Sequence, residues 1–131
     1  MEKNNGIPQT IDPDEFLYRG VHENQWDAER DRPSSATFKD SKGASVDRDA
    51  SVRDVQTCIN ALLKVKEFRA ICRVKEENVE DVGAITKYLP IPSNNYHCEI
   101  HDSEEKVSLT SSKAKKLRDG AEVVYFSPHN L

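Results

Sequence analysis

The chain has 131 residues, of which 36% are hydrophobic and 32% charged, and its 19 Lys and Arg against 23 Asp and Glu give a net charge of −4. A mildly acidic chain is not typical of a protein dedicated to coating DNA or RNA, because that binding depends on basic charge. No segment approaches the ~18 apolar residues of a membrane span, and the first residues lack the apolar stretch of a signal peptide. We therefore expect a cytoplasmic protein with no membrane partner, and one for which nucleic acid is not the sole partner.

The length suits one domain. Residues 1–14 are polar and contain Pro8 and Pro13, so we expect a flexible N-terminal tail there. A single α+β domain is expected over residues 15–126, followed by a C-terminal tail over residues 127–131.

The first strand is predicted over residues 16–21, where apolar residues gather between Asp-rich and Asn-rich sequence. Residues 22–50 are poor in large apolar side chains and predict a long polar loop, which Trp26 and Phe38 would pin to the domain. Within this loop, residues 44–48 predict a short strand.

The clearest helix is predicted over residues 52–66. Ser51 is a suitable N-cap residue, and Asp54 three residues later completes a capping-box pattern. Val52, Val55, Ile59, Leu62 and Leu63 recur at helical spacing and would face a sheet.

The remaining elements complete the predicted fold. A second, shorter helix is expected over residues 110–119 with Gly120 as its stop, and an acidic helical turn over residues 76–82. Further strands are expected over residues 68–74, 85–91, 96–101 and 121–126, and Pro90 and Pro92 confine one of them to an edge. The fold class is therefore α+β: a small mixed or antiparallel sheet of about four to six strands packed against one long and one short helix, with a long polar loop.

Cys58, Cys72 and Cys98 are odd in number and widely spaced, with no Cys-x-x-Cys pair. A disulfide framework would show an even and denser set, and a structural zinc site would show paired ligands. Each cysteine stands where an apolar residue would fit, so we expect three buried, reduced thiols.

The strand over residues 96–101 carries the most informative pattern. Residues two apart in a strand share a face, so His97, Glu99 and His101 point away from the apolar face of Cys98 and Ile100. Two imidazoles and a carboxylate can hold a divalent metal, the one cofactor that the sequence suggests, or supply a general base. Alternating polar residues are also what any half-exposed strand shows, and we favour that interpretation.

Arg19 and a serine-rich loop form a second group of candidates. Arg19 shares a strand face with Leu17 and Val21, so if that face is buried the guanidinium needs a carboxylate or phosphate partner. Guanidinium and hydroxyl groups in a polar loop are typical of sites that hold phosphate or carboxylate groups, although a solvated loop is an equal alternative. The loop candidates are Arg32, Ser34, Ser35, Ser45 and Asp47.

The order and spacing of short motifs resemble a family of small, largely uncharacterised bacterial proteins with an LxRR-type opening strand and RxSSAAF, LSV and HxEI motifs. The matching residues are Leu17–Arg19, Arg32–Phe38, Ser45–Asp47 and His97–Ile100, while Gly20 and Thr37 depart from the pattern. The resemblance implies one shared polar site and no particular chemistry.

Tyr18-Arg19-Gly20, Ser45 and Glu99 also resemble the arginine, serine and glutamate of ADP-ribosyltransferase-type folds. That resemblance implies that Arg19 would hold the pyrophosphate of NAD, and that Glu99 would stabilise the ribosyl cation at the anomeric carbon.

The sequence contains no catalytic signature, so whether the protein is an enzyme stays open. The leading hypothesis is a small accessory or partner-binding protein of a larger bacterial system, with an exposed apolar patch near Trp26 or Tyr88. The alternatives are an enzyme acting on a phosphate-bearing or nucleotide substrate, and a domain that binds a metal or small ligand. An enzyme or small-ligand site predicts that Arg19, the Ser34–Ser35 loop and the His97–Glu99 strand meet in one cavity. A metal site predicts that His97, Glu99 and His101 bind a divalent ion.

Overall fold

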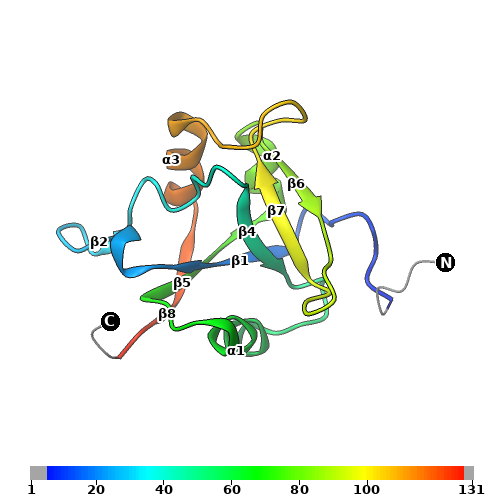
Figure 1. The fold of residues 1–131 in the computed structure, drawn as a ribbon, viewed down its shortest axis with the longest axis horizontal. Helices are drawn as coiled ribbons and strands as arrows, with labels where there is room; N and C mark the ends of the chain where they lie inside the picture. Colours follow the sequence, from blue (N-terminus) through cyan, green and yellow to red (C-terminus); the bar gives the residue numbers. More distant parts are fainter. Residues whose placement is uncertain (1–5, 129–131) are drawn as a thin grey trace.

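The computed structural model describes residues 6–128, and within them the chain forms a six-stranded antiparallel sheet, a two-stranded sheet and three α-helices (Figure 1). The elements in chain order are β1 Phe16–Val21, the 3-10 helix η1 Glu23–Gln25, β2 Trp26–Asp27, β3 Arg32–Pro33, β4 Ala44–Arg48, α1 Val55–Val65, β5 Ala70–Lys75, α2 Glu76–Asp81, β6 Ile85–Tyr88, β7 His97–His101, α3 Ser111–Asp119 and β8 Glu122–Phe126. The strands of the main sheet follow the order β6-β7-β4-β1-β5-β8. This arrangement confirms the predicted α+β class.

The hydrophobic core has two parts, one on each face of the main sheet. On one face, α1 packs Cys58 and Ile59 against Tyr18 and Ile71 of the central strands. On the opposite face, α2 and α3 help to cover a larger cluster that includes Leu17. Figure 1 shows α1 on one side of the sheet and α3 on the other. Because side chains alternate along a strand, the neighbours Leu17 and Tyr18 belong to different clusters.

The three cysteines are buried and free, as predicted. Burial raises the pKa of the Cys58 thiol to about 11 and the pKa values of Cys72 and Cys98 to about 12. The nucleophile in thiol chemistry is the thiolate, so these cysteines are packing residues.

The long helix begins later than the sequence predicts. Its N-cap is Asp54, whose side chain accepts a hydrogen bond of 2.8 Å from the Thr57 backbone N–H. Ala50 and Ser51 have positive φ angles of 54° and 62° and turn the chain before the helix. Val52 is therefore outside the helix and 77% exposed, not part of its apolar face.

The segment expected as an N-terminal tail, residues 1–14, contacts the domain over the part that the structure describes. Ile7 is buried, and the Pro8 carbonyl accepts a 2.6 Å hydrogen bond from Arg48 Nη1. The segment is held because Arg48 lies in β4 with its side chain fully buried beneath it. Residues 1–5 lie outside the described range.

The predicted C-terminal tail begins with a residue that is packed on the domain. Ser127 is buried, and its N–H donates to the Arg69 carbonyl at 2.9 Å. Residues 129–131 of that tail lie outside the described residues.

The polar segment over residues 22–50 folds as short pieces. It contains η1, the paired strands β2 and β3, turns, and β4, which confirms the strand predicted over residues 44–48. Phe38 is fully buried and Trp26 is half-buried, so both aromatic rings anchor the segment as expected. Strand β6 lies at an edge of the main sheet, as its prolines predicted.

Candidate functional site

Strand β7 presents the polar face that the sequence predicts. Cys98 and Ile100 are buried in the core, whereas His97, Glu99 and His101 are half-buried on the opposite face of the sheet. The antiparallel pairing with β4 places Ser45 directly opposite Glu99, and Asp47 directly opposite His97. Directly opposed side chains in such a pair have Cβ atoms about 4.5–5.5 Å apart, so these four residues form one polar patch.

Strands β1 and β4 separate next to this patch. Their pairing covers Leu17 and Tyr18 only, although β1 continues to Val21. The Arg19 guanidinium bridges the two strands where their pairing stops: Nη1 donates to the Ser45 carbonyl at 2.8 Å, and Nε donates to the Thr37 carbonyl at 2.7 Å. Arg19 therefore joins β1, β4 and the polar segment.

Arg19 is 7% exposed, and burial lowers the pKa of its guanidinium. The sequence predicted a carboxylate or phosphate partner for this group, and the structure gives it two backbone carbonyls in the protein instead. Carbonyl oxygens satisfy the donors without neutralising the charge. A guanidinium has five N–H groups, and these two bonds leave three for a ligand.

A cavity of about 430 Å³ opens where β1 and β4 separate, beside the C-terminal end of α1. This volume lies within the ~300–1,000 Å³ of small-molecule sites. Its polar and charged lining residues are Arg19, His22, Asp40, Ser45, Asp47, Lys66, Ser93, Asn94 and His97. Its other lining residues are Gly20, Val46, Leu62, Val65, Phe68 and Ile91. The cavity thus combines an apolar wall with hydrogen-bonding side chains that include both basic and acidic groups.

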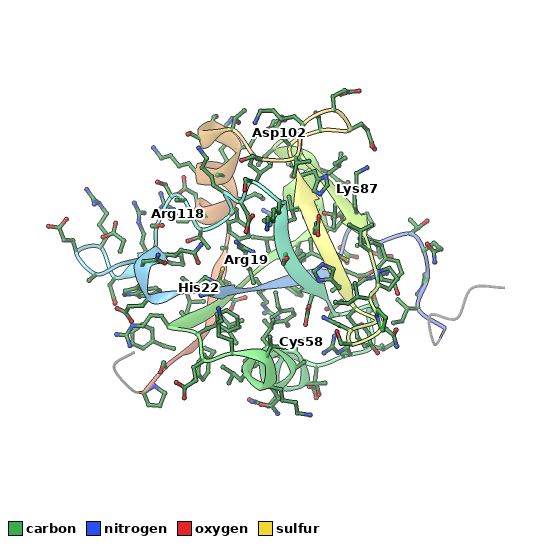
Figure 2. The ribbon with its side chains drawn as sticks, viewed as in Figure 1. Arg19, His22, Cys58, Lys87, Asp102 and Arg118 are labelled. Carbon is green, nitrogen blue, oxygen red and sulfur yellow. The ribbon has the colours of Figure 1, made fainter. Side chains whose placement is uncertain are left out.

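The cationic side chains that line the cavity are Arg19 and Lys66, and the His22 imidazole lines it with them. Burial, followed by the charges of Lys66 and Arg19, lowers the pKa of His22. Its ring packs on Phe68 with centroids 5.3 Å apart. Figure 2 shows Arg19 near the centre of the molecule and His22 farther along the same segment. Positive charge gathered beside an aromatic wall favours an anionic ligand that carries a ring.

Asp47 is the buried acid of the cavity. It is 5% exposed, and Asn94 Nδ2 donates to its Oδ1 at 2.8 Å. Burial raises the pKa of Asp47, and the hydrogen bond from Asn94 opposes that increase. The hydrogen bond from the Asn94 amide thus fixes the Asp47 carboxyl group, a hydrogen-bond acceptor, at the cavity wall.

Glu99 lies between two imidazoles. Its Oε1 is 2.9 Å from His101 Nε2, and its Oε2 is 3.6 Å from His97 Nε2. Within residues 6–128, no group of three His, Cys, Asp or Glu side chains is placed to hold a metal ion. The metal interpretation of His97, Glu99 and His101 therefore gains no support, because the carboxylate points at the imidazoles instead of sharing a common centre with them.

The serine loop lies elsewhere. Arg32 and Ser35 are exposed, Ser34 is half-buried, and none of the three lines the cavity. The loop is held toward α3 instead, because Arg118 Nη1 donates to the Pro33 carbonyl at 3.0 Å. Of the candidates taken from the sequence, Arg19, Ser45, Asp47 and His97 line this cavity, whereas Glu99, Arg32, Ser34 and Ser35 do not.

Several lining residues were not identified from the sequence: His22, Asp40, Lys66, Phe68 and Asn94. In the sequence, Lys66 is interpreted as the cationic end of the predicted helix. Phe68 is interpreted as the start of the strand that follows this helix. Asn94 lies in a turn-rich segment whose Ser93 and Asn95 neighbours gave no reason to single it out. All five lie outside the strands, in connecting segments that the fold brings together at the cavity.

Comparison with models of protein families, with curated proteins and with solved structures found no match to the chain. In the part of the chain that the structure describes, no helix combines the length and apolar character needed to cross a bilayer.

Proposed function

We propose that the cavity binds a nucleotide with a pyrophosphate group, NAD being the simplest candidate, and that the protein transfers its ADP-ribosyl group. The observation that supports this proposal is the position of Arg19, Ser45 and Glu99 on three adjacent strands, β1, β4 and β7. These are the residues whose order along the sequence resembles ADP-ribosyltransferase-type folds. Ser45 and Glu99 are direct register partners, and Arg19 is bonded to the Ser45 carbonyl.

Arg19 would bind the pyrophosphate. Its two bonds to carbonyl oxygens fix the guanidinium plane, and its remaining N–H groups suit the paired oxygens of a phosphate. Lys66 lines the same cavity and adds positive charge, and His22 adds an imidazole that can hydrogen-bond. Because hydrogen bonds hold the Arg19 side chain without a ligand, binding would not carry the entropy cost of ordering it.

The apolar wall would hold a ring of the nucleotide. Leu62, Val65 and Phe68 lie on one side of the cavity, beside the end of α1, and Ile91 comes from the segment between β6 and β7. Apolar and aromatic walls with a few polar groups are typical of sites for organic ligands.

Glu99 is not a lining residue of the cavity but lies opposite the lining residue Ser45, and from there its carboxylate would act on the reacting carbon. When the bond between the ribose anomeric carbon and the nicotinamide nitrogen breaks, the electron pair leaves with nicotinamide and the ribose becomes positively charged. A carboxylate beside that carbon stabilises this charge. A nucleophile, water or an acceptor side chain, then forms the new bond at the anomeric carbon and releases its proton to a base such as Glu99.

The test is release of nicotinamide from NAD by the purified full-length protein, with and without a mixture of acceptor proteins. We expect Glu99→Gln, which preserves shape and removes the charge, to lower the rate about 100-fold or more. Glu105→Gln is the matched control because it removes the same charge at an exposed residue outside the pairing of β4 with β7. No consumption of NAD by the wild type, or equal rates for the wild type and Glu99→Gln, would overturn the proposal.

A second candidate is the partner-binding function of an accessory protein, which one observation favours. Trp26, Asp31, Val123 and Phe126 line a separate hollow of about 300 Å³, and Val123 and Phe126 are among the exposed large apolar residues. They lie on or beside β8, an edge strand of the main sheet. Co-purification of a partner from the native host that is lost on Phe126→Ser, with the fold intact, would support this function, and retention of the partner would count against it.

A further inference from the structure

We propose that His101 and Gly43 are positioning residues that together fix the carboxylate of Glu99, which lies opposite the cavity residue Ser45. The inference rests on the proposed function for its catalytic consequence, but the structural pairing can be measured separately. Neither residue is part of the arginine, serine and glutamate set. Both are defined by their contacts with Glu99.

The first element is the hydrogen bond between Glu99 and His101. His101 Nε2 lies 2.9 Å from Glu99 Oε1, and both side chains are largely buried, with 13% and 24% exposed. A carboxylate that is ionised can only accept, so the proposal requires the imidazole proton to be on Nε2. The two residues project from the same face of β7, two positions apart, so the strand itself sets their separation.

The second element is the absence of a side chain at residue 43. A Cβ atom on Gly43 would lie 2.7 Å from Glu99 Oε1 and 2.8 Å from His101 Nε2. The backbone of Gly43 therefore closes directly over the hydrogen-bonded pair. Gly43 is buried and has a φ angle of 97°, a conformation that favours glycine.

The register partners of Glu99 on the neighbouring strands, Ser45 and Lys87, do not form an ion pair with its carboxylate. Lys87 of β6 is the register partner of Glu99, but its Nζ bonds to Glu104 at 2.8 Å (Figure 2 labels Lys87 on this edge of the sheet). On the other side lies Ser45, whose uncharged hydroxyl cannot form an ion pair with the carboxylate. His97, at 3.6 Å from Oε2, lies beyond hydrogen-bond distance. His101 is thus the side chain that determines where the carboxylate points.

Substitutions of His101 distinguish the effect of its hydrogen bond to Glu99 from the effect of its size. The amide of glutamine can donate from a place near that of Nε2, whereas the shorter asparagine cannot reach it. We expect His101→Asn to lower kcat for nicotinamide release about 10- to 100-fold with KM nearly unchanged, because misplacing a catalytic group mainly affects the transition state. His101→Gln should recover most of that loss.

Gly43→Ala tests the close approach, with Gly83→Ala as the matched control. Gly83 also has a positive φ, 83°, but a Cβ there would meet nothing nearer than 3.7 Å, the flexible Lys113 side chain. Both variants carry similar backbone strain, and only Gly43→Ala displaces the pair. We expect a loss of kcat in Gly43→Ala alone.

The NMR chemical shifts of the imidazole nitrogens test the hydrogen bond between His101 and Glu99 without any assay of activity. We expect the His101 ring to show the Nε2–H tautomer and its nitrogen shifts to change in Glu99→Gln and in Gly43→Ala. An Nδ1–H tautomer, or His101 shifts insensitive to both substitutions, would overturn the inference. If the pairing is seen and the wild type does not consume NAD, the proposed function fails while the fixed carboxylate stands. If NAD is consumed and His101→Asn matches the wild type, the positioning role fails.

Discussion

Arg48 and Glu15, 33 residues apart in the chain, form a two-pronged ion pair: Nε to Oε1 at 2.9 Å and Nη2 to Oε2 at 2.7 Å. Both side chains are almost completely buried. Arg48 also donates to the carbonyls of Pro8 and Thr10, and Glu15 accepts from the Ala50 N–H. The pair thus ties the N-terminal segment to β4, the strand that carries Ser45 and Asp47.

Loss of the Glu15 charge should destabilise the whole domain. We expect Glu15→Gln to lower the free energy of unfolding by about 3–5 kcal/mol, because it leaves the buried Arg48 guanidinium without its counter-charge. Urea denaturation measures this change, and the exposed Glu105→Gln serves as control. A loss similar to that of the control would show that the pair does not hold the segment.

Arg19 should be irreplaceable by lysine even though the charge is conserved. A lysine ammonium cannot reproduce the fork that bonds Thr37 and Ser45, so Arg19→Lys would leave buried carbonyls without donors. We expect a loss of about 1–3 kcal/mol in the free energy of unfolding. Arg30→Lys, at an exposed ion pair with Asp27, should change little. Equal effects of the two substitutions would contradict the bridging role of Arg19.

Glu76 should make stability depend on pH. Burial raises its pKa from 4.5 to about 7, and the nearby Glu80 and Glu15 carboxylates add to the increase. The folded state then binds the proton more tightly than the unfolded state, so this contribution to stability is complete below pH 4.5 and is lost as pH rises toward 7.

Glu76→Gln should remove that dependence. We expect the variant to gain stability relative to the wild type more at about pH 8 than at about pH 5, as measured by urea midpoints. The exposed neighbour Glu77 provides the control substitution Glu77→Gln. A gain that does not vary with pH would rule out Glu76 as the titrating group.

The N-cap of α1 can be assigned by a pair of alanine substitutions. Asp54→Ala removes the acceptor for the Thr57 N–H, so we expect a lower thermal midpoint. Ser51→Ala should have a smaller effect on the helix, because Ser51 lies before the helix in a turn with positive φ. Circular dichroism of both variants measures the helix loss, and the reverse order of effects would support the N-cap expected from the sequence.

Local patterns were sufficient to predict most elements. The alternation of Cys98 and Ile100 with polar residues marked β7 and its two faces, and Thr110 and Gly120 bounded α3 correctly. These signals work because each reports a periodicity or a cap within a few residues. The start of α1 failed for the same reason: Ser51 and Asp54 both suit an N-cap, and the strained turn at Ala50 decides between them.

Contacts distant in the sequence could not be predicted. Glu15 directly follows the polar stretch expected as a tail, and only its burial against Arg48 shows its role. The cavity depends on β1 and β4 being neighbours that separate after Tyr18, which fixes Arg19 beside Ser45 and excludes Ser34 and Ser35. Nothing in the spacing of these residues encodes that separation.

Titration of the ¹⁵N-labelled protein with ADP-ribose, which carries the pyrophosphate without the reactive bond, is the most direct test of the proposed cavity. The account predicts that the amide signals that shift belong to cavity residues such as Gly20, Ser45, Phe68 and Asn94. Absence of shifts at millimolar ADP-ribose, or shifts gathered around Trp26 and Phe126 instead, would contradict it.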